Sequence, residues 1–246
     1  MISSGTQILD FGGERIVYAV ERTARRKTVA ISVGYDGVRV LAPFEVNDAD
    51  ITEVVRKKGP WVLKKQALYQ ELGGNPPLRE FISGETYHYL GRPYRLKVIP
   101  DTNTLVTRIT ARGALLIAPA PSDVDPAIRR SSVRSGLRLW YRDKAKLHFP
   151  KRAKVMANLL GIPTPIIQIV DQSKRWGSCD AHGRIRLNWR LVMAPMALVD
   201  YVIAHETCHI LEHNHSHRFW RSLETIMPDY ELRVRQLDRN GHMYTW

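Results

Sequence analysis

The segment HETCHILEHNHSHRFW, residues 205–220, limits what this chain can fold into more than any other part of its sequence. Five of the nine histidines fall within it. His205, Glu206 and His209 form the pattern HExxH at the end of MALVDYVIAHETCHIL, which is apolar nearly all round and therefore predicts a buried helix. Two histidines and a glutamate are costly in such a helix unless something in the fold satisfies them.

A metal ion is the simplest group that would satisfy these side chains. Residues four apart lie on one face of a helix, about 6 Å apart along its axis, so the imidazoles of His205 and His209 can converge on one ion. Glu206 would then lie beside the open position of that ion, which is the arrangement of zinc proteases. The alternative is a pair of hydrogen-bonded core histidines without an ion.

A third ligand has to come from beyond this helix. If the helix continued through His213, its three histidines would spread over about 12 Å, too far for metal–nitrogen bonds of about 2.0–2.1 Å. We therefore expect the chain to leave the helix after about Glu212 and to bring His215 back to the ion. A final helix is expected over about residues 216–226. The rivals for the third position are Glu224 and Glu231.

The remaining pattern predicts an α+β protein. Residues 15–43 and the segments TYHYLGRPYRLKVIP and LVTRITARGALLIAP have strand character, with one interrupted helix between them. Residues 125–160 read as a long helix, and short strands and the buried helix follow. We expect a β-rich N-terminal region with one helix over residues 1–122 and a catalytic domain over residues 123–246.

Two short sequences within the N-terminal region are similar. GVRVLAP (37–43) and GALLIAP (113–119) each end a pair of expected strands and lead into a basic helical segment, and LNWRLVMAP (187–195) does the same before the buried helix. The pattern is a weak indication of an internal repeat.

The C-terminal half resembles the YgjP-like metallopeptidases, relatives of the SprT and Spartan proteases, over about residues 172–232. The matching pieces are RWGSC (175–179), LNWRL (187–191), Pro195, DYV (200–202), HExxH, NHS (214–216), FW (219–220) and PDY (228–230). The resemblance implies a zincin-like fold, with helices on a small mixed sheet. It also implies one Zn²⁺ ion held by His205, His209 and His215, with Glu206 as the catalytic residue.

The same resemblance bears on substrate binding. In zincins the strand before the active-site helix is often an open edge that pairs with an extended peptide, and GRIRLNWRLV (183–192) is in that position. The candidate substrate-binding residues are Trp176, Gly177, Asn188 and Trp189. An ordinary core tryptophan, a tight turn and a half-buried strand are the alternatives at these positions.

Charge points to a further partner. The net charge is +13, and residues 129–154 contain ten Lys or Arg and one acidic residue. Five of these cations recur every fourth residue and would form a ridge on the long helix: Arg130, Arg134, Arg138, Arg142 and Lys146. Such a ridge suggests a nucleic-acid backbone as partner, and the alternative is a solvated helix face partly paired with carboxylates.

The bulk properties exclude some classes. No uncharged apolar run reaches the length of a membrane span. The two cysteines, Cys179 and Cys208, cannot form a disulfide framework, so we expect a protein of the reducing cytoplasm. The favoured function is a zinc metallopeptidase acting on a protein or peptide. The alternatives are a nucleic-acid-associated protein with a structural zinc site, and a zinc hydrolase of a non-peptide substrate.

Overall fold

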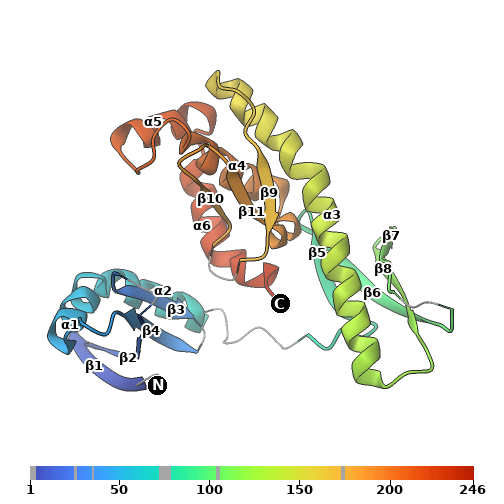
Figure 1. Ribbon diagram of the computed structural model, residues 1–246, viewed down its shortest axis with the longest axis horizontal. Coiled ribbons are helices and arrows are strands. Elements are labelled where there is room, and N and C mark those ends of the chain that lie inside the picture. The colour runs from blue at the N-terminus through green and yellow to red at the C-terminus, as the bar shows by residue number, and fades with distance from the viewer. Residues whose placement is uncertain (1–3, 25–26, 35, 72–78, 104–105, 173–174) are drawn as a thin grey trace. The chain divides into compact units, whose positions relative to one another are not determined.

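The computed structural model describes residues 4–24, 27–34, 36–71, 79–103, 106–172 and 175–246 (Figure 1). It divides into two compact units, Met1–Pro77 and Leu78–Trp246. The expected boundary after residue 122 therefore lies too late in the chain. Strands that we assigned to the N-terminal region, with Tyr87, Leu96 and Leu116, share one hydrophobic core with the long helix and the catalytic segment.

The first unit is a four-stranded sheet covered by two helices. Its strands are β1 (Ser4–Phe11), β2 (Glu14–Arg22), β3 (Ala30–Gly34) and β4 (Gly37–Ala42), in the order β1-β2-β4-β3. The helices are α1 (Asp48–Lys57) and α2 (Gly59–Glu71). Asn47 caps α1 by accepting a hydrogen bond from the Asp50 N–H at 2.8 Å. The two helices are separated at Lys58, directly before Gly59–Pro60, where the sequence predicted an interruption.

The second unit begins with a sheet of the same topology. Its strands are β5 (Thr86–Tyr89), β6 (Arg92–Asp101), β7 (Thr110–Arg112) and β8 (Leu115–Pro121), in the order β5-β6-β8-β7. In both sheets the central pair is parallel and both outer pairs are antiparallel. The two hairpin turns before the last strand each have a glycine with positive φ, Gly37 and Gly113. The similar sequences at 37–43 and 113–119 thus correspond to a repeated four-stranded topology.

Helix α3 (Pro126–Leu160) connects this second sheet to the rest of the unit. Its ends agree with the sequence, because Asp125 caps the first turn and Gly161, in the left-handed conformation, ends the last. The buried side chains recur every fourth residue along it: Val133, Leu137, Tyr141, Ala145, Phe149 and Ala153. This buried seam contacts β8 of the sheet as well as β9 and α4 (Figure 1).

A third sheet and five short helical elements complete the unit. The strands are β9 (Ile167–Val170), β10 (Gly177–Cys179) and β11 (Ile185–Asn188), in the order β10-β11-β9. The helical elements are η1 (Trp189–Met193), α4 (Met196–Cys208), α5 (His217–Ile226), α6 (Tyr230–Asn240) and η2 (Gly241–Tyr244). The third segment of the suspected repeat, 187–195, is therefore a strand end followed by a 3₁₀ helix and is not a third copy.

The strand expected over residues 183–192 differs from the observed one in two ways. It ends at Asn188, because the Asn188 side chain accepts a hydrogen bond from the Arg190 N–H and starts the 3₁₀ helix. It is also central, since β11 pairs with β10 on one side and β9 on the other, so it cannot be an open edge. No helix of the described residues is long and apolar enough to cross a membrane.

Candidate metal centre

Helix α4 and the turn after it carry the three histidines. α4 is buried nearly all round, and His205 lies in its last turn with His209 as its C-cap. The helix ends at Cys208, four residues earlier than expected, because the N–H groups of Ile210 and Leu211 bond only three residues back, to the carbonyls of Thr207 and Cys208. The early end leaves residues 209–216 free to return toward α4.

The imidazoles converge on one point. Nε2 of His205 lies 3.2 Å from Nε2 of His209 and 3.1 Å from Nε2 of His215. The candidate ligand atoms of all three lie within 4.8 Å of one another. The rivals Glu224 and Glu231 are exposed and outside this cluster, and Glu231 faces Arg235 at 3.6 Å.

Hydrogen bonding leaves these nitrogens available to an ion. Nδ1 of His209 lies 3.0 Å from the carbonyl oxygen of Glu212, which can only accept, so Nδ1 holds the proton and Nε2 keeps its lone pair. Metal-binding histidines are commonly oriented in this way. Nδ1 of His205 is buried without a partner among the described residues. The residues present therefore fit a metal ion.

Burial favours the neutral form of His205 and His209, which is the form that binds metals. Burial, together with the nearby charges of His209 and His215, lowers the pKa of His205 to about 3. Burial also lowers the pKa of His209, although the hydrogen bond to Glu212 opposes this. At neutral pH neither ring has to lose a proton before it can act as a ligand.

Glu206 is held against strand β10. Its side chain is buried, and a Cβ added to Gly177 would lie 2.8 Å from both Cγ and Oε1 of Glu206. The backbone N–H of Cys179 donates a hydrogen bond to the carboxylate. Burial raises the pKa of Glu206 to about 7, while the charge of Arg175 and the Cys179 N–H act in the opposite direction. Glycine is thus required at position 177 because the backbone approaches Glu206 closely, and not because the chain turns there.

The other expected substrate-binding residues have different roles. Asn188 is buried and donates from Nδ2 to the carbonyl oxygens of Gln172 (2.6 Å) and Arg175 (3.3 Å), so it fixes the chain before β10. Trp189 is fully buried and stacks on Tyr141. Both side chains are thus engaged inside the unit, and their expected role in substrate binding stays a prediction.

Trp176 packs against the C-terminal 3₁₀ helix η2. Its ring lies against Gly241, with a closest approach of 3.3 Å to an added Cβ, and its centroid is 6.4 Å from that of Tyr244. The side chain therefore anchors the last 3₁₀ helix. Of the four residues, only Gly177 adjoins the candidate centre.

Aromatic packing around the histidines was missed in the sequence. Phe219 is fully buried, and its ring centroid lies 4.9, 4.6 and 4.8 Å from those of His205, His209 and His215. A signal was present in the sequence, because the final helix was expected from about residue 216 and an apolar residue in its first turn can face inward. Phe219 gives the cluster an apolar floor.

The basic ridge lies beside the buried seam of α3 and has the same period of four. Its members are consequently close to other parts of the unit. Arg138 forms an ion pair with Asp171 at 2.7 Å, and Lys146 one with Asp143 at 3.3 Å. Nη2 of Arg142 donates to the Ile169 carbonyl at 3.4 Å. These three cations therefore already form ion pairs or hydrogen bonds within the unit.

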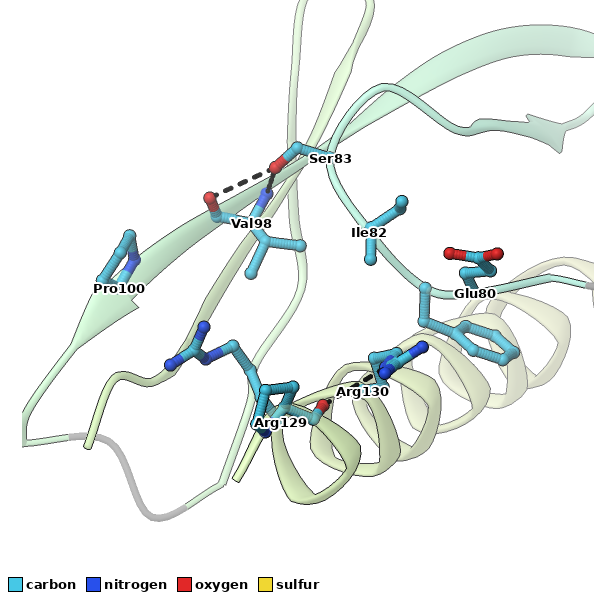
Figure 2. A pocket seen from close by; sticks show the side chains of 9 residues that line it. Glu80, Ile82, Ser83, Val98, Pro100, Arg129 and Arg130 are labelled. Carbon is cyan, nitrogen blue, oxygen red and sulfur yellow. Dashed lines mark hydrogen bonds between the residues drawn. The ribbon is translucent and has the colours of Figure 1, made fainter. Parts of the chain in front are cut away.

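The other two ridge residues lie near a pocket of about 440 Å³ at the start of α3 (Figure 2). Arg130 lines this pocket together with Arg129 and the loop at Ile82. Arg134 lies over the ring of Phe81, 5.8 Å from its centroid. The pocket includes none of the three histidines and is separate from the candidate metal centre.

Helices on a small mixed sheet, with HExxH on a buried helix and a third histidine from the following turn, define a metallopeptidase-like architecture. The family model for the YgjP-like metallopeptidase domain matches residues 27–240. The chain belongs to this family, which spans both units and implies a metal ion and a peptidase. The resemblance seen in the sequence and the α+β fold are thereby confirmed.

Two other comparisons, with curated proteins and with solved structures, give less information about this chain. No curated protein matches the chain. Among solved structures, the crystal structure of the metallopeptidase zymogen of Pyrococcus abyssi abylysin is similar at 20% identity and a TM-score of 0.34. The match covers 36% of this chain and 91% of that one.

Proposed function

We propose that this protein is a zinc-dependent metallopeptidase that hydrolyses peptide bonds. His205, His209 and His215 would hold one zinc ion per chain, and Glu206 would be the general base. The observation that supports this most directly is the convergence of three Nε2 atoms beside a buried glutamate. Three imidazoles with an open fourth position are a typical catalytic ligand set for zinc.

The chemistry then follows from the residues around the ion. Bound zinc supplies Lewis acidity and lowers the pKa of a water molecule to about 7. Glu206 takes a proton from the attacking water and passes it to the leaving amine. The Cys179 N–H and the Gly177 backbone hold the Glu206 carboxylate in place for this transfer.

Strand β10 is the edge that we propose for an extended substrate. Within the described residues it pairs only with β11, and Gly177 on this strand touches Glu206. A peptide added as a further strand would place its backbone next to the general base. This replaces the expectation that β11 is the open edge.

The function is tested with the purified full chain on casein. We expect cleavage that a chelator abolishes and added zinc restores, with a zinc content near one ion per chain. Cleavage that survives full removal of the metal would contradict the proposal. If zinc removal instead unfolds the chain and no substrate is cleaved at any zinc concentration, the structural-zinc alternative is correct. Hydrolysis of a non-peptide ester alone would support the third alternative.

Nucleic acid is a second candidate partner. The charge excess lies in the metal-binding unit, since residues 78–246 contain 26 Lys or Arg and 15 Asp or Glu. The same casein assay, run with and without DNA at low salt, decides whether such binding affects the peptidase. We place the protein in the cytoplasm, because Cys179 and Cys208 are free thiols.

Substitution of Gly177 tests the approach of β10 to Glu206. In Gly177→Ala the new methyl group has to displace the Glu206 carboxylate, and a displacement of about 1 Å can lower a rate about a hundredfold. We expect a loss of kcat of that order with zinc content retained. Ser178→Ala, in the same strand with its side chain on the opposite face, is the matched control. Equal kcat for both variants would show that the close approach is not required.

A further inference from the structure

The three candidate ligands differ in what holds their rings. His205 lies in the buried helix α4, and His209 is oriented by the hydrogen bond between its Nδ1 and the Glu212 carbonyl. His215 is exposed and lies in the connection between α4 and α5. Its Nδ1 makes no hydrogen bond to any described residue. Another interaction has to fix the orientation of this ring.

Aromatic stacking provides that interaction. The ring of His215 stacks on Trp220, with centroids 5.5 Å apart and an interplanar angle of 30°. Trp220 in turn stacks on Tyr230, with centroids 5.5 Å apart and an angle of 24°. The ring of Phe219 packs against another side of His215, with ring centroids 4.8 Å apart and an interplanar angle of 68°. The third ligand is thus the first member of a three-ring column, His215–Trp220–Tyr230.

The column connects separate parts of the backbone. His215 precedes α5, Trp220 lies in its first turn, and Tyr230 begins α6. Ser216 caps α5 through the Phe219 N–H at 3.3 Å, which fixes the start of the helix close to the ligand. The rings of Trp220 and Tyr230 are large, rigid and partly buried, so they limit rotation of the exposed imidazole.

We propose that Trp220, supported from behind by Tyr230, is the positioning residue for the third metal ligand and sets the affinity of the centre for zinc. This inference rests on the proposed role of His215. Metal-binding histidines are usually oriented by a hydrogen bond from the second ring nitrogen, and loss of such a partner typically weakens metal binding about 10–100-fold. At His215 the stack on Trp220 takes the place of that hydrogen bond.

The test measures the Kd for zinc by competition with a chromophoric chelator, on the full chain. We expect Trp220→Ala to raise the Kd about 10–100-fold. Trp220→Tyr keeps an aromatic face and should stay within about threefold of the wild type. Tyr230→Ala should give an intermediate loss. Trp61→Ala removes an exposed tryptophan from the first unit and is the control that leaves the Kd unchanged.

Thermal unfolding of the metal-free proteins separates positioning from general stability. A Trp220→Ala protein that melts like the wild type but binds zinc weakly supports the proposal. If Trp220→Ala fails to fold, Tyr230→Ala must still raise the Kd, and a wild-type Kd for that variant overturns the proposal. Equal losses in Trp220→Ala and Trp220→Tyr also overturn it. A wild-type chain that binds no zinc contradicts the proposed function itself, which distinguishes the two failures.

Discussion

Replacing Glu206 with glutamine is expected to lower peptide hydrolysis at least about a hundredfold while zinc content stays near one ion per chain. The amide is close to the carboxylate in shape, so it can keep its place against Gly177 and the Cys179 N–H. It cannot accept a proton from the attacking water. The ligand histidines are unchanged, and metal binding should therefore be retained.

The measurement compares casein cleavage and bound zinc for Glu206→Gln and for Glu224→Gln. Glu224 is exposed on α5 and lies outside the histidine cluster, so its amide variant should match the wild type in both. Substantial cleavage by purified Glu206→Gln would exclude this residue as the general base. A loss of zinc in the same variant would indicate that the carboxylate is a ligand instead.

His215→Ala is expected to weaken zinc binding by more than about a hundredfold, because two histidines of one helix then remain as the only protein ligands. His213→Ala and His217→Ala should bind zinc like the wild type, since both side chains are exposed and outside the cluster. Chelator competition gives the three dissociation constants. A greater loss in His213→Ala or His217→Ala than in His215→Ala would reassign the third ligand.

Local signals predicted the elements that carry the histidines. The helices expected over residues 125–160 and 216–226 rest on short-range patterns, and these placed α3 and α5 correctly. The pairing of His205 with His209 follows from helix periodicity alone. The end of α4 was placed too late because the switch to bonds that reach only three residues back, at Ile210 and Leu211, leaves no signature in the sequence.

Long-range pairing could not be predicted in the same way. The alternation in residues 183–192 is compatible with an edge strand and with a central one, because it reports which face is buried and not which neighbours bond to the backbone. β11 is a central strand because it also pairs with β9. In this pairing Arg186 lies opposite Gln168, which is 18 residues earlier in the chain.

The boundary between the two units shows a related limit. A change from strand to helix character near residue 122 suggested two domains, but secondary structure changes within a domain as readily as between domains. What defines the unit is the common core, in which Leu96 and Leu116 pack with Val133 and Leu137. Residues from both sides of the expected boundary therefore depend on one another for burial.

The repeated sheet topology has a mechanical consequence. After the first sheet, α1 stops at Lys57, whereas after the second sheet α3 continues to Leu160, a rod of roughly 50 Å. The C-terminal half of α3 packs against α4. There Arg152 donates two hydrogen bonds, of 2.6 and 2.7 Å, to the carboxylate of Asp200, which lies about one and a half helical turns before His205. A tilt of the rod at the sheet end would consequently turn the helix that presents the imidazoles. In the second unit the longer helix thus couples the sheet module to the geometry of the candidate metal centre.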